Sequence, residues 1–246
     1  MITAACTHTG NVRTMNQDAF VIFQKKTTGD LVAAVADGMG GHRAGNIASV
    51  LALESVRNYF DAHDDLPDER PSHEAIAAAN ECVFERANAD ADCFGMGTTI
   101  CMVQTHEDRF TCAHVGDSRV YRYSETDGLR RVTRDHSLVQ ELVDTGRIDE
   151  SEAAIHPQRN IITRAIGTAP DVEADVETDE WEKDEILLLC SDGLSSEVSD
   201  AQMEAILRKS GDIREAMDAL IDSALSAGGL DNITAILVQN CDEVNE

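Results

Sequence analysis

The sequence predicts an α+β protein in which antiparallel sheets carry helices on their outer faces. Candidate strands cluster along the chain instead of alternating with helices, and two pairs of helical segments separate these clusters. A doubly wound parallel sheet needs a helix between successive strands, so this order excludes a dinucleotide-binding fold of that type.

The strands are predicted from short runs of β-branched, aromatic and cysteine residues. These runs cover residues 2–8, 19–24, 31–36, 98–104, 109–115, 119–123, 186–190 and 233–238. The second and third strands form a hairpin, because residues 25–30 between them contain a Thr-Thr-Gly-Asp turn sequence.

The helices are predicted from apolar residues that recur at helical spacing. They cover residues 42–60, 72–89, 137–145, 200–209 and 213–227. We expect Ser72 to cap the second helix and the pair Gly228-Gly229 to end the last one. Residues 147–168 have mixed polarity and predict an irregular excursion with a short helix.

Composition favours one domain over residues 1–246, since no repeat and no Pro-, Ser- or Gly-rich linker interrupts the chain. The loosest stretch, residues 62–72, is short and polar. The N-terminal residues do not resemble a signal peptide, and no apolar run approaches the roughly 18 residues of a membrane span. The 7 cysteines include no Cys-x-x-Cys pair, which suits a reducing compartment and argues against a zinc-thiolate site. We therefore expect a cytoplasmic monomer.

A formal net charge of −26 excludes a nucleic-acid-binding role and opposes anionic membranes. A solvated acidic surface, as in salt-tolerant proteins, explains this charge more simply than an acidic docking surface does. Five arginines within residues 119–134 form a local exception. They could bind an anionic substrate or cover the outward face of two strands, and the sequence leaves both alternatives open. They are Arg119, Arg122, Arg130, Arg131 and Arg134.

Two apolar runs end on the same dipeptide, at Asp37-Gly38 and at Asp192-Gly193. Taken singly, Asp-Gly is typical of a hairpin turn. A buried strand that ends on a carboxylate is also typical of a site for a hard cation. A third carboxylate, Asp231, follows a glycine pair with one residue between and precedes another apolar run.

Counting Asp18 and Asp117, five aspartates stand at strand ends, and their number favours a metal site over five unrelated turns. Two carboxylates about 4 Å apart repel by roughly 4 kcal/mol at an effective dielectric constant near 20. Such a cluster therefore persists only with bound protons or cations. Oxygen ligands without His or Cys select Mg²⁺ or Mn²⁺ over zinc, and the carbonyl of Gly38 could add a further oxygen.

The chain resembles the metal-dependent, 2C-type serine/threonine protein phosphatase family in its compact bacterial form. The resemblance extends from residue 8 to residue 238 and rests on six short motifs in one order. They are Arg13 with Asn16-Gln17-Asp18, Asp37-Gly38-Met39-Gly40-Gly41, Gly97-Thr98-Thr99, Gly116-Asp117-Ser118-Arg119, Ser191-Asp192-Gly193 and Asp231-Asn232.

This resemblance implies an α-β-β-α sandwich with two Mn²⁺ or Mg²⁺ ions at one end. Asp37 would bridge the ions, and the Gly38 carbonyl would bind one of them. The shell of the second ion would be completed by Asp18, Asp192 and Asp231. A third ion would bind at Asp117, and Arg13 would bind phosphate. Residues of about 144–170 would form a variable flap beside the site.

The implied activity is hydrolysis of phosphoserine and phosphothreonine in proteins, by attack of a water that bridges the two ions. Arg13 and Asp37 would be the catalytic residues, and a cognate Ser/Thr kinase would supply the phosphorylated proteins. Two alternatives remain open. The fold could be a non-catalytic regulatory binding module, although all five aspartates are present. It could also be a phosphatase of a small, anti-sigma-antagonist type of regulator.

Two positions depart from many eukaryotic members of the family. Met39 replaces a histidine that acts near the leaving group, and methionine cannot transfer a proton. Leaving-group protonation would then fall to water. Gln17 replaces a glutamate, so Asp18 alone would carry the acidic role there.

Overall fold

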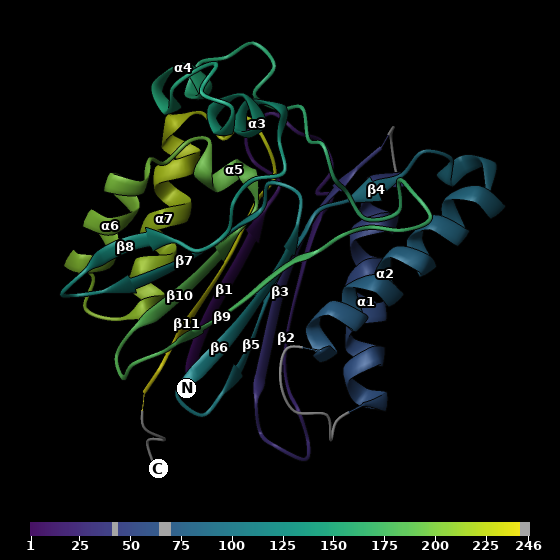
Figure 1. Ribbon diagram of the computed structural model, residues 1–246. Coiled ribbons are helices and arrows are strands. Elements are labelled where there is room, and N and C mark those ends of the chain that lie inside the picture. The colour runs from purple at the N-terminus through teal and green to yellow at the C-terminus, as the bar shows by residue number, and fades with distance from the viewer. Residues whose placement is uncertain (41–43, 64–69, 242–246) are drawn as a thin grey trace.

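Two antiparallel sheets pack face to face in the computed structural model, which describes residues 1–40, 44–63 and 70–241 (Figure 1). The first sheet contains, in spatial order, β1 (Ile2–His8), β11 (Ile233–Gln239), β10 (Ile186–Cys190), β7 (Arg119–Ser124) and β8 (Gly128–Arg131). The second contains β2 (Asp18–Gln24), β3 (Leu31–Met39), β5 (Ile100–His106), β6 (Arg109–Val115) and β9 (Asp175–Glu180), with β4 (Gly97–Thr98) paired to the end of β3.

Helices cover the outer face of each sheet, so the predicted fold class is confirmed. On the second sheet lie α1 (Ala44–Ala62) and α2 (Arg70–Ala89), and on the first α5 (Asp192–Ser195), α6 (Asp200–Lys209) and α7 (Ile213–Ala227). The short helices α3 (Leu138–Asp144) and α4 (Glu150–Ala154) lie at one end of the sandwich, beside α5 (Figure 1). Within the described ranges, no helix has the length and apolar character of a membrane span.

Three layers of core follow from the alternation of side chains along the strands. In β10, Leu187 and Leu189 point between the sheets, where they join Ile236 of β11. Leu188 and Cys190 point the other way and pack under α6 and α7. Because β10 is buried on both faces, its sequence is a continuous apolar run.

The strands that sequence patterns do not predict are short or polar. β9 lies at the edge of the second sheet, and most of its side chains are acidic and at least partly exposed. β8 is the equivalent edge strand of the first sheet. β1 and β2 are edge strands as well, but they carry the β-branched and apolar residues that predict a strand, whereas β8 has only 4 residues and β9 is mostly acidic.

Other boundaries need correction. Ser72 is not a helix cap but lies inside α2, buried, and its hydroxyl donates to Oε1 of Gln104 at 3.3 Å. The strand predicted to end before Asp37 continues through Met39, because Gly38 and Met39 pair with β4. Gly41, the predicted helix start at residue 42, and residues 64–69 of the polar stretch lie outside the described residues. The predicted excursion is confirmed, with α4 as its short helix.

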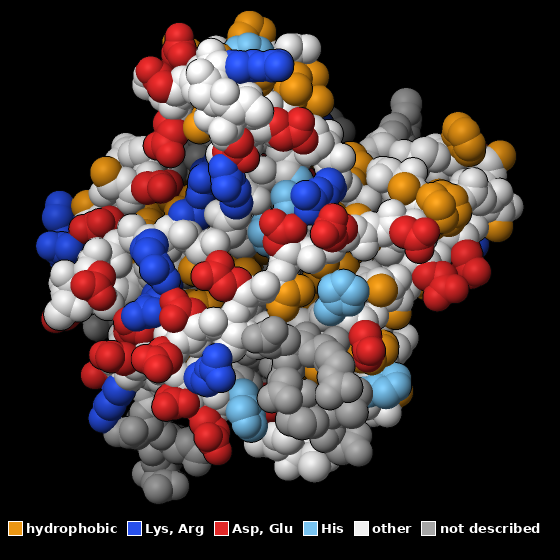
Figure 2. All heavy atoms as spheres, viewed as in Figure 1, with side chains coloured by type: hydrophobic (Ala, Val, Ile, Leu, Met, Phe, Trp, Pro, Cys, Tyr) orange, Lys and Arg blue, Asp and Glu red, His pale blue; other side chains and the backbone are white. Residues whose placement is uncertain are grey.

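The five clustered arginines all form ion pairs within the chain. Nη2 of Arg119 lies 2.7 Å from Oδ2 of Asp135, and Nη2 of Arg130 lies 2.6 Å from Oδ2 of Asp179. Figure 2 shows Lys and Arg side chains interspersed with acidic ones on this face of the molecule. The pairing supports the view that these arginines cover outward strand faces.

Replacing Ile236, which is fully buried between the sheets, tests the position of this core. We expect Ile236→Ala to lower the free energy of unfolding by about 2–5 kcal/mol, because it removes buried methylene contacts and leaves a cavity. The matched control is Ile155→Ala, whose side chain is 79% exposed and should change stability by less than about 0.5 kcal/mol. Urea unfolding of both variants checks this, and equal losses would contradict the layered core.

Candidate metal centre

Asp18 and Asp37 face each other across the β2–β3 ladder as a register pair. The backbone of Asp37 is fixed from the next strand. Its amide donates to Oγ1 of Thr99 at 3.0 Å, and its carbonyl accepts from the Thr99 amide at 2.9 Å and from Oγ1 of Thr98 at 2.8 Å. Asp37 is thus held by neighbouring hydroxyls and amides, which leaves its carboxylate free to face the other acids.

Asp192 and Asp231 come from the first sheet, where β10 ends and β11 begins. Gly193 makes their approach possible: a Cβ at this position would lie 1.9 Å from the Asn232 carbonyl oxygen and 3.5 Å from Cβ of Asp231. Glycine is therefore required for a close approach of backbones, and the hairpin-turn interpretation of this Asp-Gly pair is wrong. Asp192 instead begins α5.

Ser191 connects the two sheets at this point. Its hydroxyl donates to Oδ2 of Asp18 at 2.8 Å and accepts from the amide of Thr234 at 3.0 Å. The hydroxyl is completely buried. Asp18 of the second sheet is therefore held against the first sheet, beside Asp192.

Arg13 lies at the edge of the cluster, with its Nη2 2.7 Å from Oδ2 of Asp231. The loop that carries Arg13 is anchored by Asn232. The Asn232 amide group donates to the carbonyls of Thr9 and Met15 at 2.9 Å, and its Oδ1 accepts from the amide of Gln17 at 2.8 Å. About half of the Arg13 side chain is exposed, so its guanidinium is accessible from solvent.

Asp117 lies in the turn between β6 and β7. The next residue, Ser118, shares a hydrogen bond of 2.7 Å with Oγ1 of Thr99, the same hydroxyl that receives the Asp37 amide. Asp117 is thereby tied to the position of Asp37. The structure thus brings all five predicted aspartates together, with Arg13 beside them.

Burial and the charges of neighbouring carboxylates both raise the pKa values of the clustered aspartates. Burial raises the pKa of Asp37 well above its ordinary value, and the charges of the other four aspartates raise it further. Burial also raises the pKa of Asp18 to about 6 and that of Asp117 to about 7, with the charge of Asp192 acting in the same direction on both. The pKa of Asp192 is raised by burial and then by Asp231.

The donor set fits a hard divalent cation. The Oδ1 atoms of Asp18 and Asp192 are buried without a hydrogen-bond partner, and a bound cation would satisfy both. All donors in this cluster are oxygens, as Mg²⁺ and Mn²⁺ prefer. Gly38, the further predicted ligand, is buried, and its carbonyl lies close to Gly45 at the start of α1.

A groove of about 660 Å³ leads away from the cluster. Asp117 and Asp192 lie in its wall, Gln140 and Glu150 belong to α3 and α4, and Asp200 begins α6. The segment of about 144–170, the predicted flap, therefore borders the groove that opens onto the carboxylates.

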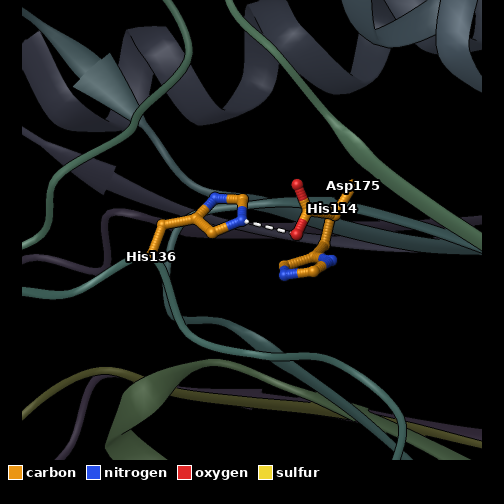
Figure 3. Close-up of side chains that lie close together, drawn as sticks. All are labelled: His114, His136 and Asp175. Carbon is orange, nitrogen blue, oxygen red and sulfur yellow. Dashed lines mark ion pairs between the residues drawn. The ribbon is translucent and has the colours of Figure 1, made fainter. Parts of the chain in front are cut away.

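Three polar side chains that support the acids belong to motifs already quoted from the sequence, namely Ser191, Thr99 and Asn232. Sequence patterns place them beside the acids but assign them no role, which only their hydrogen bonds reveal. A second polar cluster was also missed: His114, His136 and Asp175 lie together although no short spacing joins them (Figure 3). His114 and Asp175 meet because they are a register pair of β6 and β9.

The raised pKa of Asp18 makes the stability of the metal-free protein depend on pH. The unfolded value is about 3.9, so the folded state binds this proton more tightly, and the resulting stability is lost as pH rises through about 6. In the presence of a chelator, we expect the unfolding free energy to fall by about 1 kcal/mol from pH 5 to pH 8 through Asp18. Asp18→Asn should remove that part of the slope in denaturant titrations, and an unchanged slope would contradict the raised pKa.

Comparisons with known proteins agree with this geometry. The family model described as Protein phosphatase 2C matches residues 7–232. The serine/threonine phosphatase stp of Listeria innocua is 39% identical over 237 residues, which cover 95% of this chain and 93% of the relative.

Two solved structures show the same fold. A bacterial serine phosphatase is 36% identical with a TM-score of 0.90, covering 99% of this chain and 100% of that one. The catalytic domain of the phosphatase PstP, in complex with two manganese ions, is 34% identical with a TM-score of 0.85, covering 98% of each chain. The chain belongs to the protein phosphatase 2C family of metal-dependent serine/threonine phosphatases.

Proposed function

We propose that the five clustered aspartates would hold two Mn²⁺ or Mg²⁺ ions and a third, weaker one, with Asp37 as a ligand of the first two and the Gly38 carbonyl as a further ligand. Asp18, Asp192 and Asp231 complete the shell of one ion, and Asp117 holds the third, weaker one. The observation that carries this proposal is the convergence of five carboxylates. Two of them, Asp18 and Asp192, each have a buried oxygen without a hydrogen-bond partner. The two manganese ions of the similar PstP structure support the first two of these sites.

When bound, the ions supply a nucleophilic water of lowered pKa and neutralise charge on the transferred phosphoryl group. The chain supplies positioning. Hydrogen bonds from Thr98 and Thr99 fix Asp37, and Ser191 fixes Asp18. Arg13 offers a planar, permanently charged fork at the exposed edge of the cluster, where it binds phosphate oxygens.

The leaving group receives its proton from water in the groove. Met39 cannot donate one, and its methyl group lies against Gly97, where a Cβ would be 2.7 Å from Met39 Cε. Met39 and Gly97 meet because they are register partners where β3 pairs with β4.

The groove beside the flap accommodates the phosphorylated segment of a protein substrate. Its volume and its opening onto Asp117 and Asp192 support an extended segment that carries phosphoserine or phosphothreonine. A cognate Ser/Thr kinase supplies such substrates. We place the enzyme in the cytoplasm as a single-domain monomer, an assignment that rests on its composition and cysteine usage.

Removing the central carboxylate tests the proposed centre. We expect Asp37→Asn to lower kcat/KM for p-nitrophenyl phosphate with Mn²⁺ at least about 100-fold, because it weakens the hold on the ions that stabilise the transition state. The matched control, Asp61→Asn, changes an aspartate on α1 that pairs with Lys26 and should retain activity. Chelation should abolish turnover of the unaltered enzyme, and Mn²⁺ should restore it. Full activity of the Asp37 variant would refute the assignment.

Arg13 is tested by its effect on phosphate binding. We expect Arg13→Ala to lower kcat/KM for a phosphothreonine peptide by about 10- to 100-fold, since a hydrogen bond to a charged group contributes about 1.5–3 kcal/mol. Arg13→Lys keeps the positive charge but lacks the planar guanidinium, so its kcat/KM should lie between those of the unaltered enzyme and Arg13→Ala. If Arg13→Ala changes only the Mn²⁺ requirement, through its contact with Asp231, its role is in metal binding and not in substrate binding.

A further inference from the structure

His136 holds the turn before Asp117 at two points. Its backbone amide donates to the Gly116 carbonyl at 2.9 Å, and its ring Nδ1 accepts from the Gly116 amide at 3.1 Å. His136 is buried, and its ring stacks on that of His114 with centroids 4.7 Å apart. His136 therefore bonds both backbone groups of Gly116: its ring accepts from the Gly116 amide, and its own amide donates to the Gly116 carbonyl.

These contacts fix the tautomer of His136. Since Nδ1 accepts a hydrogen bond, the ring proton lies on Nε2, which is 3.3 Å from Oδ2 of Asp175 (Figure 3). Burial lowers the pKa of His136, so its ring is neutral near pH 7. Asp175 is itself held by Arg164 at 2.8 Å. The result is a chain of contacts from Arg164 through Asp175 and His136 to Gly116.

The same three side chains have ligand atoms within 4.8 Å of one another, which invites comparison with a metal site. The hydrogen bonds oppose that interpretation. A histidine that binds a metal through Nε2 carries its proton on Nδ1, yet here the Gly116 amide donates to Nδ1. The Arg164 guanidinium, 3.4 Å from Nε2 of His136, would also repel a cation.

Asp117 needs such external support. Among the described residues, no side chain hydrogen-bonds its carboxylate, so its direction depends on the backbone of the turn. Gly116 has a φ of +107°, which side chains rarely adopt, and a Cβ there would lie 2.6 Å from Cγ2 of Thr99. Glycine adopts this φ without strain but also allows many others, so the hydrogen bonds around the turn select its shape.

We propose that His136 is a positioning residue that fixes the turn at Gly116 and so aims the Asp117 carboxylate at a divalent cation. The inference rests on the proposed function, which makes Asp117 a ligand. His136 also reaches the flap, because the amide of Thr163 donates to its carbonyl at 2.8 Å and the next residue, Ser137, caps α3. His136 thus contacts both the turn that carries Asp117 and the base of the flap.

A matched pair of substitutions tests this role. In His136→Asn the amide oxygen takes the place of Nδ1 and still accepts from Gly116, whereas His136→Gln reaches toward Asp175 and leaves Gly116 without an acceptor. We expect His136→Gln to weaken the weakest Mn²⁺ site about 10-fold, and His136→Asn to weaken it less than about 3-fold. Calorimetric titration of chelator-treated protein with Mn²⁺ measures this directly.

Asp117→Ala serves as the reference. It should remove the weakest Mn²⁺ site, and His136→Gln should have no further effect on Mn²⁺ binding in that background. Asp175→Ala, at a side chain that is 47% exposed, should weaken the site without loss of folding. If Asp117→Ala leaves Mn²⁺ binding unchanged, the proposed ligand role of Asp117 fails; if only the His136 and Asp175 variants are without effect, the positioning role alone fails.

Two further outcomes would overturn the positioning role. A lower melting temperature with unchanged Mn²⁺ affinity in His136→Gln would make the residue merely structural. One equivalent of Zn²⁺ bound by Asp117→Ala and lost in Asp117→Ala with His114→Ala would mean that the three side chains form a metal site instead.

Discussion

Repulsion among five carboxylates is the constraint on which the rest of this structure depends. Nothing in the local sequence holds like charges together, so the fold must supply rigid supports. Asp18 and Asp37 are fixed by paired strands, and Asp192 and Asp231 by the meeting of two backbones at Gly193. Burial first, and the charges of neighbouring aspartates after it, raise the pKa values of these acids, so holding them ionised here opposes both effects.

The acids also come from both halves of the sandwich. Asp18 and Asp37 belong to the second sheet, and Asp192 and Asp231 flank strands of the first. Cations bound here would therefore link the two sheets at the end of the shared apolar core. Since bound metal stabilises only the folded arrangement, metal binding and the packing of the sheets reinforce each other.

Sequence patterns predict the strands and helices that are buried, because burial imposes an apolar period. They fail at β8, which is too short to show a period, and at β9, which is mostly acidic. They also fail at Ser72, a polar residue inside a helix whose hydroxyl finds a partner on a strand. The five aspartates are predictable because each stands at the end of an apolar run. His136 and Asp175 are not, since only the register of β6 with β9 and the path of the loop after β8 bring them to Gly116.

The position of β11 couples completion of the first sheet to completion of the acidic cluster. Among the described residues, β11 follows every other strand along the chain, yet it lies between β1 and β10, inside the first sheet. Without β11, β1 has no strand partner in that sheet, and Asp231 and Asn232, which directly precede β11, are not brought to the acidic cluster. Insertion of one strand therefore closes the first sheet and delivers the last carboxylate in the same step.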